Sequence, residues 1–536
     1  MEPHHLRAPA VDGAVLSSPP LSDVGSQLVE NQNRLAAWDY DFQGRRAGWL
    51  RMQARNQAIT HAKAELERFG LALPSLADPA APWIATGHQP ELFHPGVWIK
   101  NFAAGELAKV HHAVSLNLIV DNDLPKGASI RVPHCDGDAL RSVPVEFDEW
   151  DGDIPYEDWA VSDEAKFANF GQRVAETLGT LVPDPLINEF WPGALQAAEV
   201  TDRVGLRLTA ARRGLEASWG VSNWEVPLGK VCESEAFLWF ASHLLAHLPR
   251  FQGVHNGSLA RYRALYGIRS RNHPVASLRQ EGPWLEAPFW VWRAGQPRRR
   301  PLMARQLAKT MQLRIGGEDE PFAEIPLGPD REACCAVEQL HALPGRRIRL
   351  RTRALTTTLF ARLLLADVFL HGIGGAKYDE LGDEIAREFF GLKPPSYQTL
   401  SMTAWLGLEP APATPDQFHD VEHQLRDLRF NPERFLTDAV VGDWSSVVLS
   451  KQEAIAGPVE TRRQRVSRFF EIRRCNEALQ EAVQPVKSRL ETERSALLAG
   501  LRRNRLVHHR EYPFVLHSAS RLRETFRRAL TDQLGG

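Results

Sequence analysis

The chain of 536 residues is 43% hydrophobic and 24% charged, and its formal net charge is −2. It is longer than a single hydrophobic core usually supports, so two or three structural units are expected. The near-neutral charge argues against nucleic acid as a partner, and the sequence lacks the run of roughly 20 apolar residues that a membrane helix needs. The first residues, Met1–His5, do not have the pattern of a signal peptide. We therefore expect a cytoplasmic protein without a membrane partner.

Residues 1–82 are predicted to form an N-terminal arm and a helical lead-in. Residues 1–25 are rich in Pro, Ser and Gly, as in a flexible arm. Residues 26–70 repeat apolar side chains at helical spacing. Three prolines in residues 71–82 indicate a linker into the next segment.

An α/β core is predicted over residues 83–400. Its first part combines a strand from Trp83, a turn at Thr86–Gln89, an amphipathic helix at Val97–Val110 and a buried strand at Leu116–Val120. Open α/β sheets bind ligands beyond the carboxyl ends of their strands. This unit therefore predicts a nucleotide or small-molecule site.

The middle of the core, at about residues 160–345, is predicted to be a mainly helical insertion. Helical character extends over residues 165–270. The segment Glu286–Trp292, followed by Arg298–Leu302, predicts a β-hairpin with a basic tip.

α/β character returns over residues 346–400. Period-two alternation at Arg347–Arg351 predicts a half-exposed strand. An apolar helix at Leu355–Leu365, a short buried strand at Asp367–His371 and a helix at Leu381–Phe390 complete the predicted core.

Residues 401–536 are predicted to form a C-terminal helical, coiled-coil-like domain. Proline clusters mark the exit from the core, and between Arg462 and Arg528 there are 17 Lys or Arg residues against 7 Asp or Glu. We expect these helices to support a homodimer.

The predicted turn after the first strand is the first candidate site. A strand-to-helix turn presents free backbone N–H groups and the positive end of a helix dipole, which suit phosphate or carboxylate. We expect Thr86, Gly87, Gln89 and Lys100 to bind such a group, and His88 to act as acid or base.

Two further segments supply candidate residues. Asp121 and Asp123 follow the second strand, where a carboxylate can hold a ribose or a substrate amine, so we expect them to act with His88 in catalysis. The later strand runs into a glycine-rich segment that we expect to close as a loop over the ligand. Its predicted binding residues are His371, Gly372, Gly374, Gly375, Lys377, Asp379 and Glu380.

In this order, the three motifs resemble the bacillithiol biosynthesis cysteine-adding enzymes. That family has a T-G-x-Q-x-x-L-F turn before a Lys-containing helix, similar to Thr86–Phe93 followed by Lys100. Its acidic E-D-x-D strand end is similar to Val120–Asp123, with valine here in place of the first glutamate. Its late G-G-x-x-E stretch is comparable to Gly374–Glu380, within the divergent H-G-I-G-G-A-K-Y-D-E segment.

The resemblance covers roughly residues 83–390 and implies a Rossmann-like parallel sheet, related to class I nucleotidyltransferases, with helical insertions and a C-terminal coiled coil. It implies a ligase that joins cysteine to a glucosaminyl-malate acceptor, with ATP or ADP as the bound cofactor and no metal. Small molecules are therefore the expected partners.

Two alternatives remain at this point. A metal-dependent hydrolase would use His88, His94, Asp121, Asp123 and His371. A non-catalytic scaffold would instead work through the C-terminal coiled coil.

Overall fold

The computed structural model describes residues 6–75, 78, 80–137, 139–270, 272–436 and 438–535, with no side chains given for 438–441. The first five residues, on which the signal-peptide expectation rests, lie outside this range, as does part of the expected linker. The described residues form two compact units, one from 1–132, 143–406 and 510–536 and the other from 133–142 and 407–509. In the part of the chain so described, no helix has both the length and the apolar character to cross a membrane.

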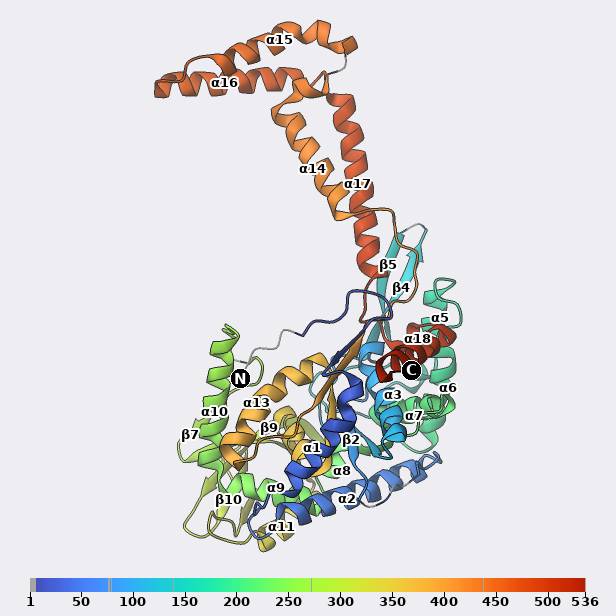
Figure 1. The fold of residues 1–536 in the computed structure, drawn as a ribbon, viewed down its shortest axis with the longest axis vertical. Coiled ribbons are helices and arrows are strands. Elements are labelled where there is room, and N and C mark those ends of the chain that lie inside the picture. The colour runs from blue at the N-terminus through green and yellow to red at the C-terminus, as the bar shows by residue number, and fades with distance from the viewer. Residues whose placement is uncertain are drawn as a thin grey trace. The chain divides into compact units, whose positions relative to one another are not determined.

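A six-stranded, mostly parallel sheet forms the centre of the first unit (Figure 1). Its spatial order is β1-β14-β13-β2-β3-β6, and only the edge strand β1 is antiparallel to its neighbour. The strands are β1 (Val15–Ser18), β2 (Trp83–His88), β3 (Val114–Ile119), β6 (Trp224–Pro227), β13 (Val368–His371) and β14 (Gln398–Met402). The sheet confirms the α/β prediction.

The chain changes direction across this sheet between β2 and β13. From β2 it proceeds outward through β3 to β6, and it then returns to the other side of β2 as β13 and β14. At such a switch point the loops that follow two adjacent parallel strands diverge, which opens a crevice at the carboxyl edge.

Helices cover both faces of the sheet. Alternate residues of β2, Trp83 and Ala85, join a large apolar core with α2 (Ala47–Arg68), α9 (Glu235–Ala246) and α13 (Ile373–Phe390). The other face packs against α3 (Pro95–Val110), which contacts β2, β3 and β14. The remaining helices of this unit are α1 (Val24–Ala36), α4 (Glu164–Ala168), α5 (Phe170–Leu178), α6 (Ile187–Gln196), α7 (Val204–Ser218), α8 (Leu228–Val231), α10 (Leu248–Leu265), α11 (Cys334–His341), α12 (Ala354–Phe360) and α18 (Ala519–Leu534).

A second, antiparallel sheet belongs to the same unit. Its order is β11-β10-β9-β8-β12, with β7 paired to β8. The strands are β7 (Gln280–Glu281), β8 (Trp284–Arg293), β9 (Gln296–Gln306), β10 (Met311–Ile315), β11 (Ala323–Ile325) and β12 (Ile348–Thr352). A separate two-stranded sheet pairs β4 (Ser129–Asp136) with β5 (Ala139–Glu146).

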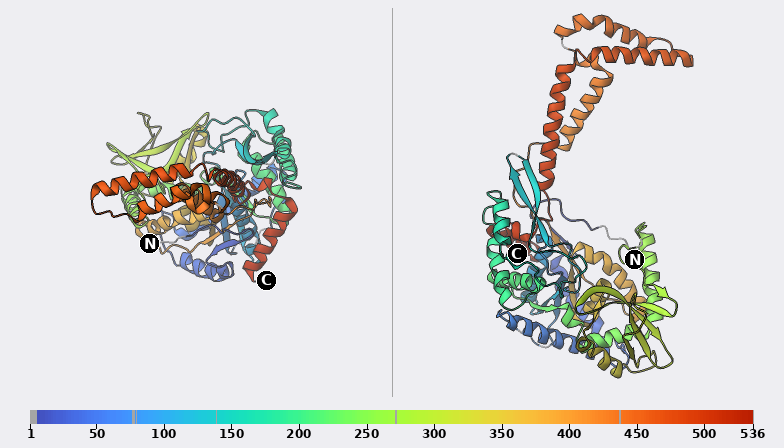
Figure 2. Two further views of the ribbon diagram at one scale, coloured as in Figure 1. Left: turned by 90° about the horizontal axis from the view of Figure 1, so that it is seen from above. Right: turned by 180° about the vertical axis from the view of Figure 1, so that it is seen from behind.

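The second unit consists mainly of four long helices. Figure 1 and the right-hand view of Figure 2 show α14 beside α17 and α15 beside α16. Val421 and Leu428 of α14 pack with Val483 and Leu490 at the start of α17, so each pair is seven residues apart. The helices are α14 (Pro415–Phe430), α15 (Asp438–Ala456), α16 (Arg462–Leu479) and α17 (Gln484–Val507).

Several sequence-based expectations need correction. Residues Thr86–His88 continue strand β2 and do not form a turn, because β3 pairs with all three of them and β13 also pairs with Thr86. The expected insertion at about 160–345 supplies β6 to the main sheet and contains most of the second sheet, so it is not mainly helical throughout. The chain also leaves the helical unit at residue 510 and returns to the first unit.

Candidate functional site

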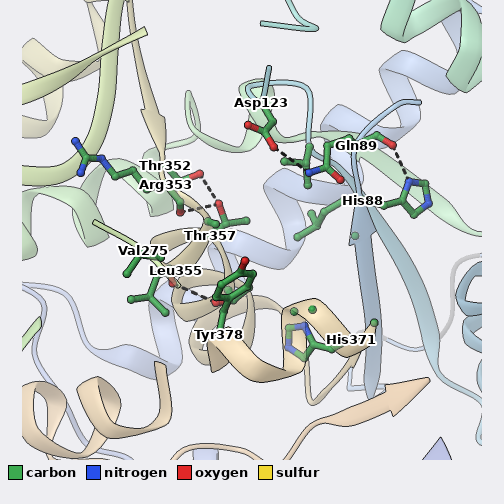
Figure 3. Close-up of a pocket in the computed structure, with 18 of the residues that line it drawn as sticks. His88, Gln89, Asp123, Val275, Thr352, Arg353, Leu355, Thr357, His371 and Tyr378 are labelled. Atoms are coloured by element: carbon green, nitrogen blue, oxygen red, sulfur yellow. Dashed lines mark hydrogen bonds between the residues drawn. The ribbon is translucent and has the colours of Figure 1, made fainter. Parts of the chain in front are cut away.

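A cavity of about 690 Å³ opens at the carboxyl ends of β2, β3 and β13. It brings together His88 of β2, Asp123 after β3 and Gly374 at the start of α13. In Figure 3, Gln89 and Asp123 lie on one side of the cavity, with His371 and Tyr378 on the other. The three sequence motifs therefore contribute to a single pocket.

Most of the residues predicted from sequence line this cavity. They are Gly87, His88, Gln89, Lys100, Asp123, His371, Gly372, Gly374 and Gly375. Five other predicted residues are not part of the lining, and these are Thr86, Asp121, Lys377, Asp379 and Glu380.

Lys100 is a buried cation in the wall of the cavity. Its side chain projects from α3, is only 4% exposed, and donates from Nζ to the Gly87 carbonyl at 3.3 Å. Burial lowers the pKa of Lys100 from 10.5 to about 8, so the ammonium form still predominates at neutral pH. A charge buried against a neutral partner is costly, and a bound anion would compensate it.

The amino end of α3 lies close to Lys100 and also lines the cavity. His94 caps this helix by accepting a hydrogen bond from Gly96 N at 3.1 Å. A Cβ on Gly96 would lie 2.4 Å from the Met402 carbonyl and 2.8 Å from Arg510, so only glycine permits this packing. Arg510 therefore approaches the positive end of the helix dipole, a combination that favours anions.

A second basic group comes from the antiparallel sheet. The guanidinium carbon atoms of Arg299 and Arg353 lie 5.2 Å and 4.1 Å from the centre of the Trp290 ring. Arg299 also donates to Asp123 Oδ1 at 3.0 Å, and Gln89 donates to the other oxygen of Asp123 at 2.9 Å. Asp123 therefore positions two other side chains of the cavity.

Three arginines of the lining have unused donors. Within the residues that the structure describes, the buried Nε–H groups of Arg299, Arg353 and Arg510 have no hydrogen-bond partner. Buried polar groups are nearly always paired in folded proteins. These three atoms have almost no accessible surface, and arginines outside the cavity, such as Arg213 and Arg314, also have a buried nitrogen without a partner in the described part of the chain.

His88 is held by protein partners. Its Nδ1 lies 3.1 Å from the Gln89 carbonyl, and its Nε2 lies 3.1 Å from Oδ1 of Asn101, whose amide donates to Glu216. Both partners are acceptors, and a neutral ring can donate to only one of them. Burial, with the nearby charges of Arg212 and Lys100, lowers the pKa of His88 well below its usual value. This geometry favours a structural role over the acid–base role expected from sequence.

The residues behind His88 form a buried polar network. Arg212 of α7 pairs with Glu216 and with Glu225 of β6, each at 2.8 Å. Glu216 accepts from Asn101 at 2.8 Å, which links the network to the His88 ring. Paired charges of this kind fix the position of α3 against the sheet.

The predicted residues outside the lining have other partners. Thr86 donates to the Leu370 carbonyl at 3.0 Å and so joins β2 to β13. Asp121 accepts from Gly229 N at 2.8 Å, and burial, with the nearby charge of Glu157, raises the pKa of Asp121 to about 8. Asp121 does not line the cavity, so the structure does not support the catalytic role expected for it.

The glycine-rich segment also differs from expectation. Gly372 caps α13, and Gly374 and Gly375 lie in its first turn, so they do not form a loop that closes over the ligand. Lys377 is exposed on this helix. Glu380 is buried and accepts from the Tyr266 hydroxyl at 2.6 Å.

The five residues of the metal-hydrolase alternative do not form a metal-binding group. Across the described ranges, no cluster of three or more His, Cys, Asp or Glu side chains has the arrangement to hold a metal ion. His94 instead caps α3, and Asp123 pairs with Arg299.

Comparisons with known proteins do not identify the chain. No family model matches it, and no curated protein matches it.

Sequence reasoning missed the arginines of the site. Arg299 lies in the Arg298–Arg300 run, and that run was the available signal. Arg353 continues the alternation of Arg349 and Arg351 and lies one residue beyond the end of β12. Arg510 comes from the far end of the chain, and nothing in its local sequence indicates that it reaches this cavity.

Proposed function

We propose that this protein is a ligase- or transferase-type enzyme that binds anionic small molecules in the central cavity. The observation that carries the proposal is the charge of the lining. Lys100, Arg299, Arg353 and Arg510 line the cavity together with two acids, Asp123 and Glu511.

The strand order supports a Rossmann-like core within this proposal. Numbered along the chain, the five parallel strands have the spatial order 3-2-1-4-5 that is typical of dinucleotide-binding folds. In those folds the ligand lies at the switch point, which is where the cavity opens here. We therefore propose ATP or ADP as one ligand, with its phosphates near Lys100.

The resemblance to the cysteine-adding enzymes suggests the reaction. We propose that the second ligand is cysteine, or another amine- or thiol-bearing small molecule, which is joined to a sugar-type acceptor. Incubation with cysteine, glucosaminyl-malate and ATP should yield a product that contains both organic substrates. Mass spectrometry would detect it, and absence of any joined product would refute this substrate pair.

Binding can be tested before the substrates are known. Saturating ADP should raise the thermal unfolding midpoint of the wild type, because a ligand that binds only the folded state stabilises it. Lys100→Met should abolish this shift. Lys109→Met, on the same helix but exposed and paired with Glu106, should retain it. An equal ADP response in all three proteins would contradict the proposal.

The second unit suggests a coiled coil that forms a homodimer. Its core residues have heptad spacing, and five large apolar side chains on α15 and α16 are between 46% and 60% exposed, namely Leu449, Ile455, Val466, Phe469 and Phe470. Light scattering should show a dimer that the double variant Phe469→Glu, Phe470→Glu dissociates. A monomeric wild type would contradict this part of the proposal.

A further inference from the structure

His371 is the last residue of β13 and lies against the first turns of α13. It lines the cavity, and its Nε2 lies 2.6 Å from Oδ2 of Asp379. On the other side of the ring, a Cβ on Gly375 would approach Nδ1 to 2.9 Å. The imidazole fits here only because residue 375 is glycine.

Asp379 is a buried carboxylate held in its ionised form. Burial alone would raise the pKa of Asp379, but the nearby His371 and Arg362 lower it to about 2. Nη1 of Arg362 lies 3.0 Å from Oδ2 of Asp379, the oxygen that faces His371, and 2.7 Å from Oδ1 of Asp383. The contact of Nε2 with Oδ2 is an ion-pair distance that does not meet hydrogen-bond geometry. An ionised carboxylate only accepts hydrogen bonds, so its proximity favours the hydrogen on Nε2. Nδ1 of a neutral His371 is then an unprotonated base.

Two aromatic rings flank the imidazole of His371. Tyr397 contacts the ring edge-on at 5.1 Å between centroids, and Phe369 lies 4.5 Å away. Tyr378 lines the same cavity. Among the residues that the structure describes, the ion pair of His371 involves Nε2, whereas both nitrogens of His88 face acceptors.

We infer that His371 is the proton-accepting residue of this cavity, and that Asp379 is a positioning residue that sets its tautomer. This inference rests on the proposed function, since it assigns the base for the same ligand. The N–H or S–H bond of the bound nucleophile breaks, its electron pair stays on nitrogen or sulfur, and the proton bonds to Nδ1. The imidazolium that results is stabilised by the Asp379 carboxylate, as in other His–carboxylate pairs.

The tautomer can be tested without a known substrate. Diethyl pyrocarbonate modifies unprotonated imidazole nitrogen, and peptide mapping at pH 7 gives the rate for each histidine. His371 is only 3% exposed and reached through the cavity, so we expect it to react in the wild type more slowly than exposed His419, the internal standard. Asp379→Asn should slow this reaction, because a neutral amide oxygen shared with Arg362 holds the hydrogen on Nε2 less strongly than the carboxylate does.

Asp383→Asn is the matched control. Like Asp379→Asn, it removes one negative charge that faces Arg362, but it leaves the contact between Asp379 and His371 in place. It should change the rate less than twofold. Should Asp379→Asn fail to fold, Gly375→Ala serves as the second variant, since its methyl group would cover Nδ1. An unreactive His371 in the wild type, or equal slowing by both aspartate variants, would overturn the inference.

Activity separates a catalytic from a structural role. His371→Gln should lower kcat of the coupling reaction at least a hundredfold with little change in KM, and it should keep the ADP-induced thermal shift. A raised KM with unchanged kcat would overturn the inference. If the wild type neither binds ADP nor forms product, the proposed function fails, and the carbethoxylation rates still decide the orientation of His371.

Discussion

Replacing Lys100 with methionine should make the free protein more stable at neutral pH. Burial lowers the pKa of Lys100 from 10.5 to about 8 in the folded state. This drop corresponds to about 3 kcal/mol of lost stability when the lysine is protonated in both states. Loss of the hydrogen bond to Gly87 offsets about 1 kcal/mol of the gain. We therefore expect Lys100→Met to raise the free energy of unfolding by about 2 kcal/mol at pH 7.

The predicted gain depends on pH in a defined direction. Because the folded pKa lies below the unfolded value, the full cost of Lys100 is present below about pH 8 and declines as the pH rises toward 10.5. Above 10.5 the lysine is neutral in both states and the cost is absent. The advantage of Lys100→Met should therefore disappear between pH 8 and 10.5.

Thermal unfolding followed by circular dichroism at pH 7 and pH 10 would measure this difference. Lys109→Met is the control, because Lys109 lies on the same helix with an exposed side chain paired to Glu106. It should change the midpoint little at either pH. The expected pH dependence requires Lys100 to be an uncompensated buried cation. This view would be refuted if Lys100→Met were less stable than the wild type at pH 7 and less stable by the same amount at pH 10.

Three other predictions concern the cavity and the polar network behind His88. Arg212→Met should lower the free energy of unfolding by about 3–5 kcal/mol, since it leaves two buried carboxylates unpaired; a loss below about 1 kcal/mol in thermal or urea unfolding would contradict this. Gly96→Ala should cost about 1–3 kcal/mol because its Cβ meets the carbonyl of Met402, the last residue of β14. Gly48→Ala, with open space around it, should be tolerated. Arg299→Gln should weaken ADP binding about tenfold in calorimetry. Arg298→Gln, which changes an exposed neighbour, should not weaken it. Equal loss of ADP affinity in both variants would show that only the overall charge matters.

The sequence predicted the parts of the fold that depend on local pattern. The apolar spacing of Val97–Val110 and the run Leu116–Val120 correspond to α3 and β3, each within two residues. Strand β6 was missed because its four residues, Trp224–Pro227, lie within a long helical stretch. They become a strand by pairing with β3, a contact that is distant in sequence.

Tertiary contacts also explain the errors at the site. Gly374 and Gly375 have poor helix propensity, and yet they lie in α13, where Gly375 makes room for His371. Arg351 belongs to an alternating pattern that predicted exposure, but it is buried and pairs with Glu157 at 2.9 Å. Local patterns indicate which strand ends carry polar residues. They do not show which distant arginines complete the cavity.

A crystal structure of the protein soaked with ADP would test the central claim most directly. The phosphates should lie in the cavity at the carboxyl ends of β2, β3 and β13, within hydrogen-bond distance of Lys100 and at least one of Arg299, Arg353 and Arg510. ADP bound elsewhere on the molecule, or an empty cavity at saturating ADP, would contradict the account.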